Sequence, residues 1–319
     1  MANGSAHDEL PEHDRQLIAV LQYDGRISTE RAAAVLGYGT REVQRRLRTL
    51  TDSGTVRVVA RRTRGADAGA TLLRIKVVSG KLDAITAALA RREDVPFVDI
   101  SAGGDEISAV LLHSFEPRNR LIFQQLPATR AVTSVTAQTV LHVFSEAADW
   151  RLDVLTAGQR AALTRTTVRT RPCPPLDSTD EDIVAALEAD GRLPATAVAQ
   201  STGHAESTVR RRLAALFARG HVRTEVIVDP QRLGLTVDAN IWMEVPPDQL
   251  DATGRALAEH PAVHGTLATT GRTNLCVAVW FRDTQELYRF LTHDLSGRSI
   301  TGTDTVLMGQ WIKRGVLQR

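Results

Sequence analysis

The stretch "STVRRRLAALFARGHVR" at residues 207–223 repeats the pattern of arginine, leucine, valine and glycine found in "EVQRRLRTLTDSGTVR" at residues 42–57. Shifting the chain by 166 positions aligns residues 10–57 with residues 176–223 without a gap. The aligned matches include Asp24-Gly25-Arg26 with Asp190-Gly191-Arg192. Because apolar, glycine and arginine positions agree together, the chain contains an internal duplication. The shift is far longer than the roughly 20–50 residues of solenoid repeats, so each copy is a domain-sized unit.

The sequence pattern of each copy predicts three helices. In the first copy the apolar spacing predicts helices over 12–23, 28–36 and 40–53, with Ser28 as the N-cap of the second. Gly37 makes the turn into the third helix, Gly54 closes it, and a short strand over 55–60 follows as a wing. Three short helices with a glycine turn before the last indicate a helix-turn-helix.

The third helix of each copy divides into an apolar stripe and a polar face. Val43, Leu47 and Leu50 form the stripe in the first copy, and Val209, Leu213 and Leu216 form it in the second. The side chains off the stripe are the candidate DNA contacts: Thr40, Arg41, Gln44, Arg45 and Arg48, then Ser207, Thr208, Arg210 and Arg211. Arg46 and Arg212 directly precede core leucines, so we expect them to brace the fold.

The basic charge is concentrated around these helices. Residues 26–64 carry ten arginines against three acids, and residues 192–232 carry seven against three, in a chain whose net charge is only +2. A run of arginines is usually a solvated helix face, but here it coincides twice with the third helix of a helix-turn-helix. The pattern therefore favours double-stranded DNA as the partner. Arg61 and Arg62, after the first wing, are expected to contact backbone phosphates.

A different periodicity follows each basic unit. Strands and helices alternate in the order β-α-β-β-α-β, which is the ferredoxin-like order. The first copy has strands over 71–78, 97–102, 106–113 and 134–144 and helices over 80–92 and 116–126; the second has strands over 237–247, 262–271, 274–281 and 304–313 and helices over 248–259 and 284–294. One face of such a sheet lacks helices. Trp242, Val277, Val279 and Trp280 are too apolar for water, so we expect this face to be covered by a second sheet, from the other unit or another chain.

The predicted class is thus α+β, with two tandem units, each a winged helix-turn-helix followed by a βαββαβ ferredoxin-like domain. The expected bounds are 10–64 and 176–230 for the helix-turn-helix domains, 70–146 and 235–315 for the sheet domains, and 147–175 for a Pro-rich linker. No apolar run approaches the ~20 residues that cross a bilayer, so no membrane partner is expected. Two cysteines, Cys173 and Cys276, cannot make a disulfide framework, which favours the cytoplasm.

The second half, with "VRRRLAALFARGHV", "VIVDPQRLGL" and "TTGRTNLCVAVWF", resembles the leucine-responsive/asparagine-type (Lrp/AsnC) transcriptional regulators over residues 176–315. The whole chain is similar to the tandem-fused form of that family. The resemblance implies a DNA-binding regulator that senses an amino acid and forms homo-oligomers through its sheet domains, which are of the ACT/RAM type. It also implies a small effector at the turn between the second and third strands of each sheet domain, at Gly103, Gly104 and Asp105 and at Gly271, Thr273 and Asn274. Asn274 stands where an Asp is common in the family.

Two alternatives remain. Some fused proteins of the same architecture resemble sirohaem decarboxylases, and "RLGLTVDANIWMEVP" has a faint likeness to them; a nucleoid-type DNA-binding protein without an effector is the other. The histidines do not gather as an acid–base site requires: His113 and His142 lie in apolar strands as expected core residues, and Pro261 interrupts the spacing of His260 and His264. Neither a phosphate-binding glycine loop nor a nucleophile elbow is present. We therefore expect no enzyme, no cofactor and no metal.

Overall fold

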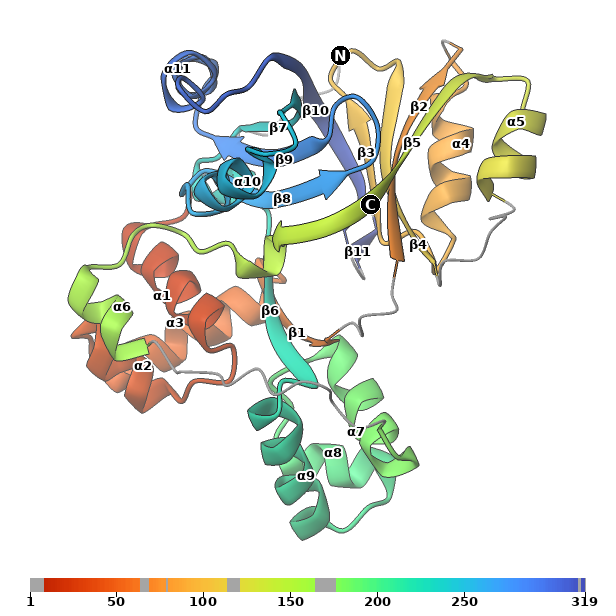
Figure 1. Cartoon of the computed structure of the whole chain (residues 1–319). Helices are drawn as coiled ribbons and strands as arrows, with labels where there is room; N and C mark the ends of the chain where they lie inside the picture. Colours follow the sequence, from red (N-terminus) through yellow and green to blue (C-terminus); the bar gives the residue numbers. More distant parts are fainter. Residues whose placement is uncertain are drawn as a thin grey trace. The chain divides into compact units, whose positions relative to one another are not determined.

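The computed structural model describes residues 9–63, 69–78, 80–113, 121–163, 176–314 and 317–318. These residues divide into two compact units, and each unit draws on both copies of the repeat. The helical unit comprises the described parts of residues 1–63 and 151–234, and the sheet unit comprises those of residues 64–150 and 235–319 (Figure 1). Residue 64, the linker residues 164–175 and the start of the predicted helix 116–126 lie outside the described residues.

The first helix-turn-helix consists of α1 (Glu12–Tyr23), α2 (Thr29–Leu36) and α3 (Thr40–Asp52), within a residue or so of the predicted ranges. The Ser28 side chain caps α2 by accepting a hydrogen bond from the backbone N–H of Arg31 at 3.2 Å, as predicted. Gly37 ends α2 in the left-handed conformation, with φ of 73°, which glycine adopts at little cost. The helix α6 (Ala157–Leu163), from the expected linker, contacts α2.

The second helix-turn-helix repeats this arrangement with α7 (Ser178–Ala189), α8 (Ala195–Thr202) and α9 (Glu206–Ala218). Its core contains the predicted stripe of α9 and apolar residues of α7 and α8: Ile183, Val184, Leu187, Val198, Val209, Leu213 and Leu216. In the first copy Val43 and Leu50 are buried, whereas Leu47 is only half-buried. The predicted apolar stripe of the third helix is therefore fully buried in the second copy and only partly buried in the first.

The two helix-turn-helix domains are joined by a pair of strands. β1 (Val56–Arg62) runs antiparallel to β6 (Val222–Val228), from Val56 opposite Val228 to Arg62 opposite Val222. The strand predicted as a wing is therefore not a separate wing on the first copy, because its partner is the equivalent strand of the second copy. A 3-10 turn, η3 (Pro230–Leu233), follows β6. Its Arg232 carbonyl accepts a hydrogen bond from the backbone N–H of Leu10 at 2.8 Å.

The repeated Asp-Gly-Arg turns lie at this junction. Gly191 donates its backbone N–H to the carbonyl of Val58 at 2.7 Å, and a Cβ added to Gly191 would lie 2.7 Å from the backbone carbon of Val59. Gly25 is as crowded, since its Cβ would lie 2.7 Å from Thr224. Only glycine allows this approach, so the duplicated glycine serves the pairing of the two copies.

The sheet unit contains two four-stranded antiparallel sheets of ferredoxin-like order. The first has β2 (Gly69–Val77), β3 (Phe97–Ser101), β4 (Glu106–His113) and β5 (Val132–Ser145); the second has β7 (Val237–Glu244), β8 (Val263–Thr269), β9 (Leu275–Phe281) and β10 (Gly302–Arg314). Their orders are β5-β2-β4-β3 and β10-β7-β9-β8. The short strand β11 (Leu317–Gln318) pairs with β10. The predicted α+β class and strand order are confirmed.

Two helical segments accompany each sheet. The first sheet has α4 (Leu82–Ala90) and a π turn, η1 (Leu121–Gln125), that leads into the short α5 (Leu126–Ala128). Figure 1 shows α4 and α5 side by side on one face of strands β2 to β5. The second sheet has α10 (Leu250–Ala258) and α11 (Thr284–Arg289), which continues as the π turn η4 (Phe290–Asp294). A 3-10 turn, η2 (Ala147–Asp149), follows β5.

The long strands β5 and β10 connect the two sheets. Residues 132–139 of β5 pair with β2 of its own sheet, and residues 140–145 pair with β8 of the other. In the same way β10 pairs first with β7 and then with β3. Eight strands therefore close on themselves as in a barrel. Leu72 of the first sheet packs with Trp242 and Cys276 of the second, so the predicted covering of one sheet face by the other occurs within a single chain.

The predicted set of residues on this inner face was wrong at two positions. Val277 and Val279 pack in the core between the second sheet and its helices, with Leu257, Leu287 and Phe290. The reason is the alternation of side chains along a strand, which places Val277 and Val279 on the face opposite to Cys276 and Trp280. Trp242 and Trp280 do lie on the face away from the helices.

Candidate nucleic-acid interface and sensor turns

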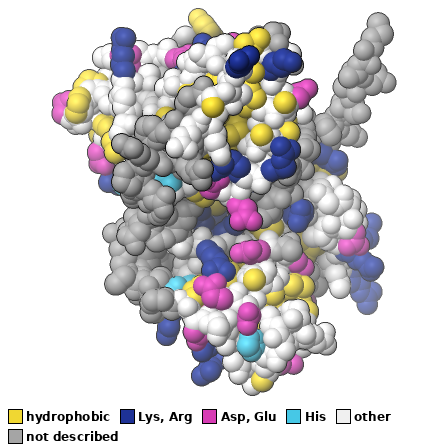
Figure 2. All heavy atoms as spheres, turned by 90° about the vertical axis from the view of Figure 1, so that its right-hand side faces the viewer, with side chains coloured by type: hydrophobic (Ala, Val, Ile, Leu, Met, Phe, Trp, Pro, Cys, Tyr) yellow, Lys and Arg dark blue, Asp and Glu magenta, His cyan; other side chains and the backbone are white. Residues whose placement is uncertain are grey.

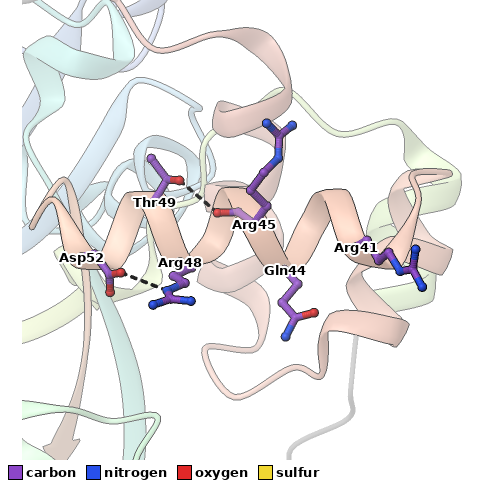
Figure 3. A pocket seen from close by; sticks show the side chains of 6 residues that line it. All are labelled: Arg41, Gln44, Arg45, Arg48, Thr49 and Asp52. Atoms are coloured by element: carbon purple, nitrogen blue, oxygen red, sulfur yellow. Dashed lines mark hydrogen bonds and ion pairs between the residues drawn. The ribbon is translucent and has the colours of Figure 1, made fainter.

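The outer face of α3 carries the predicted candidates in exposed positions. Thr40, Arg41, Gln44, Arg45 and Arg48 are all exposed. Figure 3 shows the side chains of α3 that line a hollow on this face, which are Arg41, Gln44, Arg45, Arg48, Thr49 and Asp52. Arg48 pairs with Asp52 at 3.2 Å. No carboxylate among the described residues pairs with Arg41 or Arg45, so these two guanidinium groups keep their donors for an outside acceptor.

The outer face of α9 is similar but not identical. Ser207, Arg210 and Arg211 are exposed, and Thr208 is half-buried. Arg210 forms an ion pair with Glu206 one turn earlier, whereas Arg211 has no acidic partner within the described ranges. The same face thus presents one paired and one unpaired arginine. Exposed i,i+4 pairs contribute only a few tenths of a kcal/mol, so Arg210 can exchange Glu206 for a phosphate.

The neighbouring arginines Arg46 and Arg212 brace the fold, as predicted. Arg46 binds Asp14 of α1 and Glu42, each at 2.9 Å. At the equivalent place in the second copy, Arg212 binds Asp177 at 2.8 Å and Asp180 at 3.1 Å. Hydrogen bonding to Asp14 raises the pKa of Arg46. Both arginines therefore tie the third helix to the first helix of its own domain.

The structure gives Arg61 and Arg62 partners that the sequence did not indicate. Arg61 pairs with Glu225 on β6 at 3.0 Å, and Arg62 pairs with Glu181 and, at 3.7 Å, with Glu188 of α7. These ion pairs link the two copies across the β1–β6 junction. Figure 2 shows dark blue and magenta side chains close together near the middle of the face it presents. Arg61 and Arg62 are thus weaker candidates for phosphate contact than the arginines of α3.

The two turns at which the family resemblance implies an effector, here called the sensor turns, differ in the exposure and hydrogen bonds of their residues. At the first turn Gly103, Gly104 and Asp105 are exposed, and the Asp105 carboxylate accepts a hydrogen bond from the Ser101 hydroxyl at 3.1 Å. At the second turn Gly271 is exposed, while Thr273 and Asn274 are half-buried.

The side chain of Asn274 is fully engaged. Its amide bonds both the N–H and the carbonyl of Val245, at 3.0 and 2.8 Å, so it connects the turn to the end of β7. Both polar atoms of the Asn274 amide are therefore bonded to the backbone of the protein itself.

Sequence reasoning missed a group of charges between the two sheets. Arg314 of β10 pairs with Asp99 of β3 at 3.3 Å and with Asp238 of β7. Burial raises the pKa of Asp99 to about 6, although Arg314 opposes this. His264 lies 3.9 Å from Asp238 and stacks on Trp280, and burial lowers its pKa. The available signal was a lone Asp within each apolar strand, in "FVDIS" and "TVDAN".

A second charged group lies near the other end of β10. Arg74 of β2 binds Glu106 and Asp304, each at 2.6 Å, and its guanidinium lies 5.6 Å from the ring centre of Trp242. Each group thus contains one arginine shared by two carboxylates, with residues from both sheets. In each group the arginine bonds one carboxylate of its own sheet and one of the other sheet, so the ion pairs link the two sheets.

The other histidines are dispersed. His142 is exposed and not a core residue as predicted, because it lies where β5 leaves its own sheet for the other. His113 is half-buried and bonds the Thr71 hydroxyl at 2.9 Å. His260 lies 3.6 Å from Asp294. In the part of the chain that the structure describes, no three His, Cys, Asp or Glu side chains are grouped as a metal site would need.

Comparison with known proteins decides the family. The AsnC-type helix-turn-helix domain matches residues 12–51 and 176–216, and the Lrp/AsnC ligand binding domain matches residues 238–316. The HTH-type transcriptional regulator FL11 of Pyrococcus horikoshii is 31% identical over 137 residues, which are 42% of this chain and 89% of that protein. The chain belongs to the Lrp/AsnC family. It carries two of the family's DNA-binding domains, and its relatives are named as transcriptional regulators.

A further relative agrees with this assignment, and a solved structure shares the fold. The HTH-type transcriptional regulator LrpA of P. horikoshii is 26% identical over 121 residues, covering 38% of this chain and 86% of LrpA. The crystal structure of the siroheme decarboxylase NirDL has the same tandem fold, with a TM-score of 0.63, 16% identity, and 97% and 94% of the two chains covered. Such low identity shows a shared fold and no more. No helix among the described residues of this Lrp/AsnC protein has the length and apolar character needed to cross a membrane.

Proposed function

We propose that this Lrp/AsnC chain is a two-headed, sequence-specific DNA-binding regulator whose heads are the outer faces of α3 and α9. The observation that carries the proposal is the separation of roles between adjacent arginines. In each copy one arginine, Arg46 or Arg212, is held by carboxylates of its own domain. Its neighbour, Arg45 or Arg211, is exposed and has no acidic partner among the described residues.

The two heads differ in the residues that face outward. The first presents Thr40, Arg41 and Gln44, and the second presents Ser207 and Arg210 with Glu206 beside it. Gln and Arg read different base edges, since Gln pairs bidentately with adenine and Arg with guanine. We therefore infer that the two heads prefer different half-sites, which a homodimer of single units could not do.

We also propose that a small effector, most simply an amino acid, binds at a sensor turn of the sheet unit and shifts how chains assemble through their sheet domains. An effector acts only if it binds one assembly better than another. A nucleoid-type protein with the same fold would bind DNA without this response. A change in assembly mass or DNA affinity on adding an amino acid therefore separates the two.

The enzyme alternative rests on the fold of the siroheme decarboxylase NirDL. A decarboxylase needs cationic side chains free to bind carboxylates of its substrate. Here Arg314 and Arg74 are both shared between carboxylates of the protein itself. This favours the regulator. Visible absorption by the purified protein, from a bound tetrapyrrole, would reverse that preference.

The proposal is tested by the affinity for a duplex from the gene's own upstream region, measured at several salt concentrations. Arg45→Ala and Arg211→Ala should each weaken binding by about 1–3 kcal/mol if the side chain reads a base, or lower the slope of log K against log salt by about 1 if it contacts phosphate. Arg91→Ala is the matched control, because Arg91 is an exposed arginine of the sheet unit. Affinity that drops equally in all three variants contradicts the assignment.

A further inference from the structure

The second sensor turn is occupied by a side chain of the same chain. Gln138, from β5 of the first sheet, places its Nε2 amide 2.7 Å from the Thr270 carbonyl and 2.8 Å from the Thr273 carbonyl. The same nitrogen lies 3.3 Å from the Thr273 hydroxyl. Gln138 is only 5% exposed. The Gln138 amide therefore already donates to two backbone carbonyls of this turn, those of Thr270 and Thr273.

The fit between Gln138 and the turn is close. A Cβ added to Gly271 would lie 2.7 Å from Gln138 Nε2, so the amide lies directly against the glycine. Gly271 has φ of 100°, a conformation that glycine adopts far more readily than other residues. The backbone beside it is also tied, because Thr139 N–H donates to the Thr270 hydroxyl at 3.0 Å and Thr270 N–H to the Thr139 carbonyl at 2.9 Å.

The first sensor turn has no such occupant at the equivalent position. The pairing of the two sheets is pseudo-symmetric: Ala102 N–H donates to the Leu307 carbonyl at 2.7 Å, as Thr270 N–H does to Thr139. Leu307 thus corresponds to Thr139, and the preceding residue, Val306, corresponds to Gln138. Valine has no donor for the carbonyls of the turn. Gly103, Gly104 and Asp105 stay exposed around it.

We propose that the chain binds one effector molecule and not two, at the first turn, because the Gln138 amide already occupies the second. This inference rests on the proposed sensor function and adds to it the regulation of the site. The amide donates to the same kind of acceptor that an amino group of a ligand would use. An amino group at the second turn must first displace the two part-buried hydrogen bonds of Gln138, whereas Val306 at the equivalent place of the first turn makes no such bonds.

Reciprocal variants test this directly. Gln138→Val gives the second turn the residue of the first, and Val306→Gln gives the first turn the residue of the second. Each of the twenty amino acids is screened by thermal shift at about 10 mM, and those that stabilise the wild type are titrated by calorimetry into all three proteins. We expect one equivalent per chain for the wild type, two for Gln138→Val, and at least about tenfold weaker binding for Val306→Gln.

Two outcomes overturn the inference while leaving the sensor function intact. The first is that the wild type binds two equivalents of the amino acid per chain. The second is that Val306→Gln binds the amino acid with the affinity of the wild type. If none of the three proteins binds any amino acid, amino-acid sensing itself is contradicted. A measurement that needs no ligand then tests whether Gln138 occupies the second turn.

The ligand-independent measurement is hydrogen exchange of side-chain amides in protein labelled with 15N at glutamine. The Gln138 signal, identified by its loss in Gln138→Val, should exchange at least about a hundredfold more slowly than that of exposed Gln44. The Gln44 signal is identified in the same way with Gln44→Ala. Equal exchange rates for the two amides would show an open turn and overturn the inference whatever the ligand result.

Discussion

Arg26 and Arg192 bind each other's turns reciprocally. Arg26 donates to the carbonyls of Gly191 and Leu193, the latter at 2.9 Å, and Arg192 donates to those of Gly25 and Ile27, the latter at 3.1 Å. The arrangement is that of a two-fold symmetric dimer, here made within one chain. It explains why the Asp-Gly-Arg turn is repeated along with the helices.

Removing this reciprocal contact should destabilise the helical unit. Arg26→Ala leaves two part-buried carbonyls without their donor, and Arg192→Ala does the same on the other side. We expect each substitution to lower the free energy of unfolding by about 1–3 kcal/mol. Urea unfolding followed by circular dichroism measures this. Arg41→Ala, an exposed arginine of the same unit, should change stability by less than about 0.5 kcal/mol.

Two glycines of the helical unit should respond in opposite ways to alanine. Gly191→Ala forces a Cβ against the backbone of Val59, so we expect a loss of about 2 kcal/mol or more and weakened pairing of β1 with β6. Gly158 lies in α6 with open space around it, and Gly158→Ala should be neutral or stabilise by up to about 1 kcal/mol. Melting temperatures compare the two. Similar melting temperatures would contradict the close approach of the copies.

Adjacent arginines of α9 should separate stability from DNA binding. Arg212→Ala leaves Asp177 and the mostly buried Asp180 without their partner, and we expect a loss of about 1–2 kcal/mol of unfolding free energy. Arg211→Ala should leave stability within about 0.5 kcal/mol. Denaturant midpoints for both variants check this. A larger loss of stability in Arg211→Ala than in Arg212→Ala would show that Arg211, and not Arg212, braces the fold.

The charges between the sheets should make stability depend on pH. The pKa of Asp99 is about 6 in the folded protein, against 3.8 for an ordinary Asp. Between pH 4 and 6 the folded state therefore holds a proton that the unfolded state has released, and this group's contribution to stability falls as pH rises through that window. The neighbouring His264 has a lowered pKa and acts in the opposite direction, so a variant comparison is needed.

We expect the wild type to lose stability relative to Asp99→Asn as pH rises from 4 to 6, by an amount on the order of 2 kcal/mol. Above about pH 7, where Asp99 is ionised in both states, the two profiles should run parallel. Unfolding free energies measured at half-unit pH intervals provide the comparison. Profiles that are parallel from pH 4 upward would show that Asp99 ionises normally beside Arg314 and Asp238.

Features set by local chemistry could be predicted from the sequence. The range 12–23 matches α1, and the range 40–53 exceeds α3 by one residue, because apolar spacing and glycine turns determine them. Pairings between distant segments could not be predicted in the same way. Nothing local to Gln138 indicates Thr270 as its partner, and nothing local to Arg62 indicates Glu181. Arg61 and Arg62 were assigned to phosphate because a basic run does not reveal acids that approach it from another domain.

The central claim, that one chain presents two different DNA-reading heads, is tested most directly by selecting binding sites from random duplex DNA with the wild type, Arg45→Ala and Arg211→Ala. We expect the wild type to select a site with two unlike half-sites, and each variant to lose sequence preference in one half while keeping it in the other. Selection of a palindrome by the wild type, or of the same site by all three proteins, would contradict the claim.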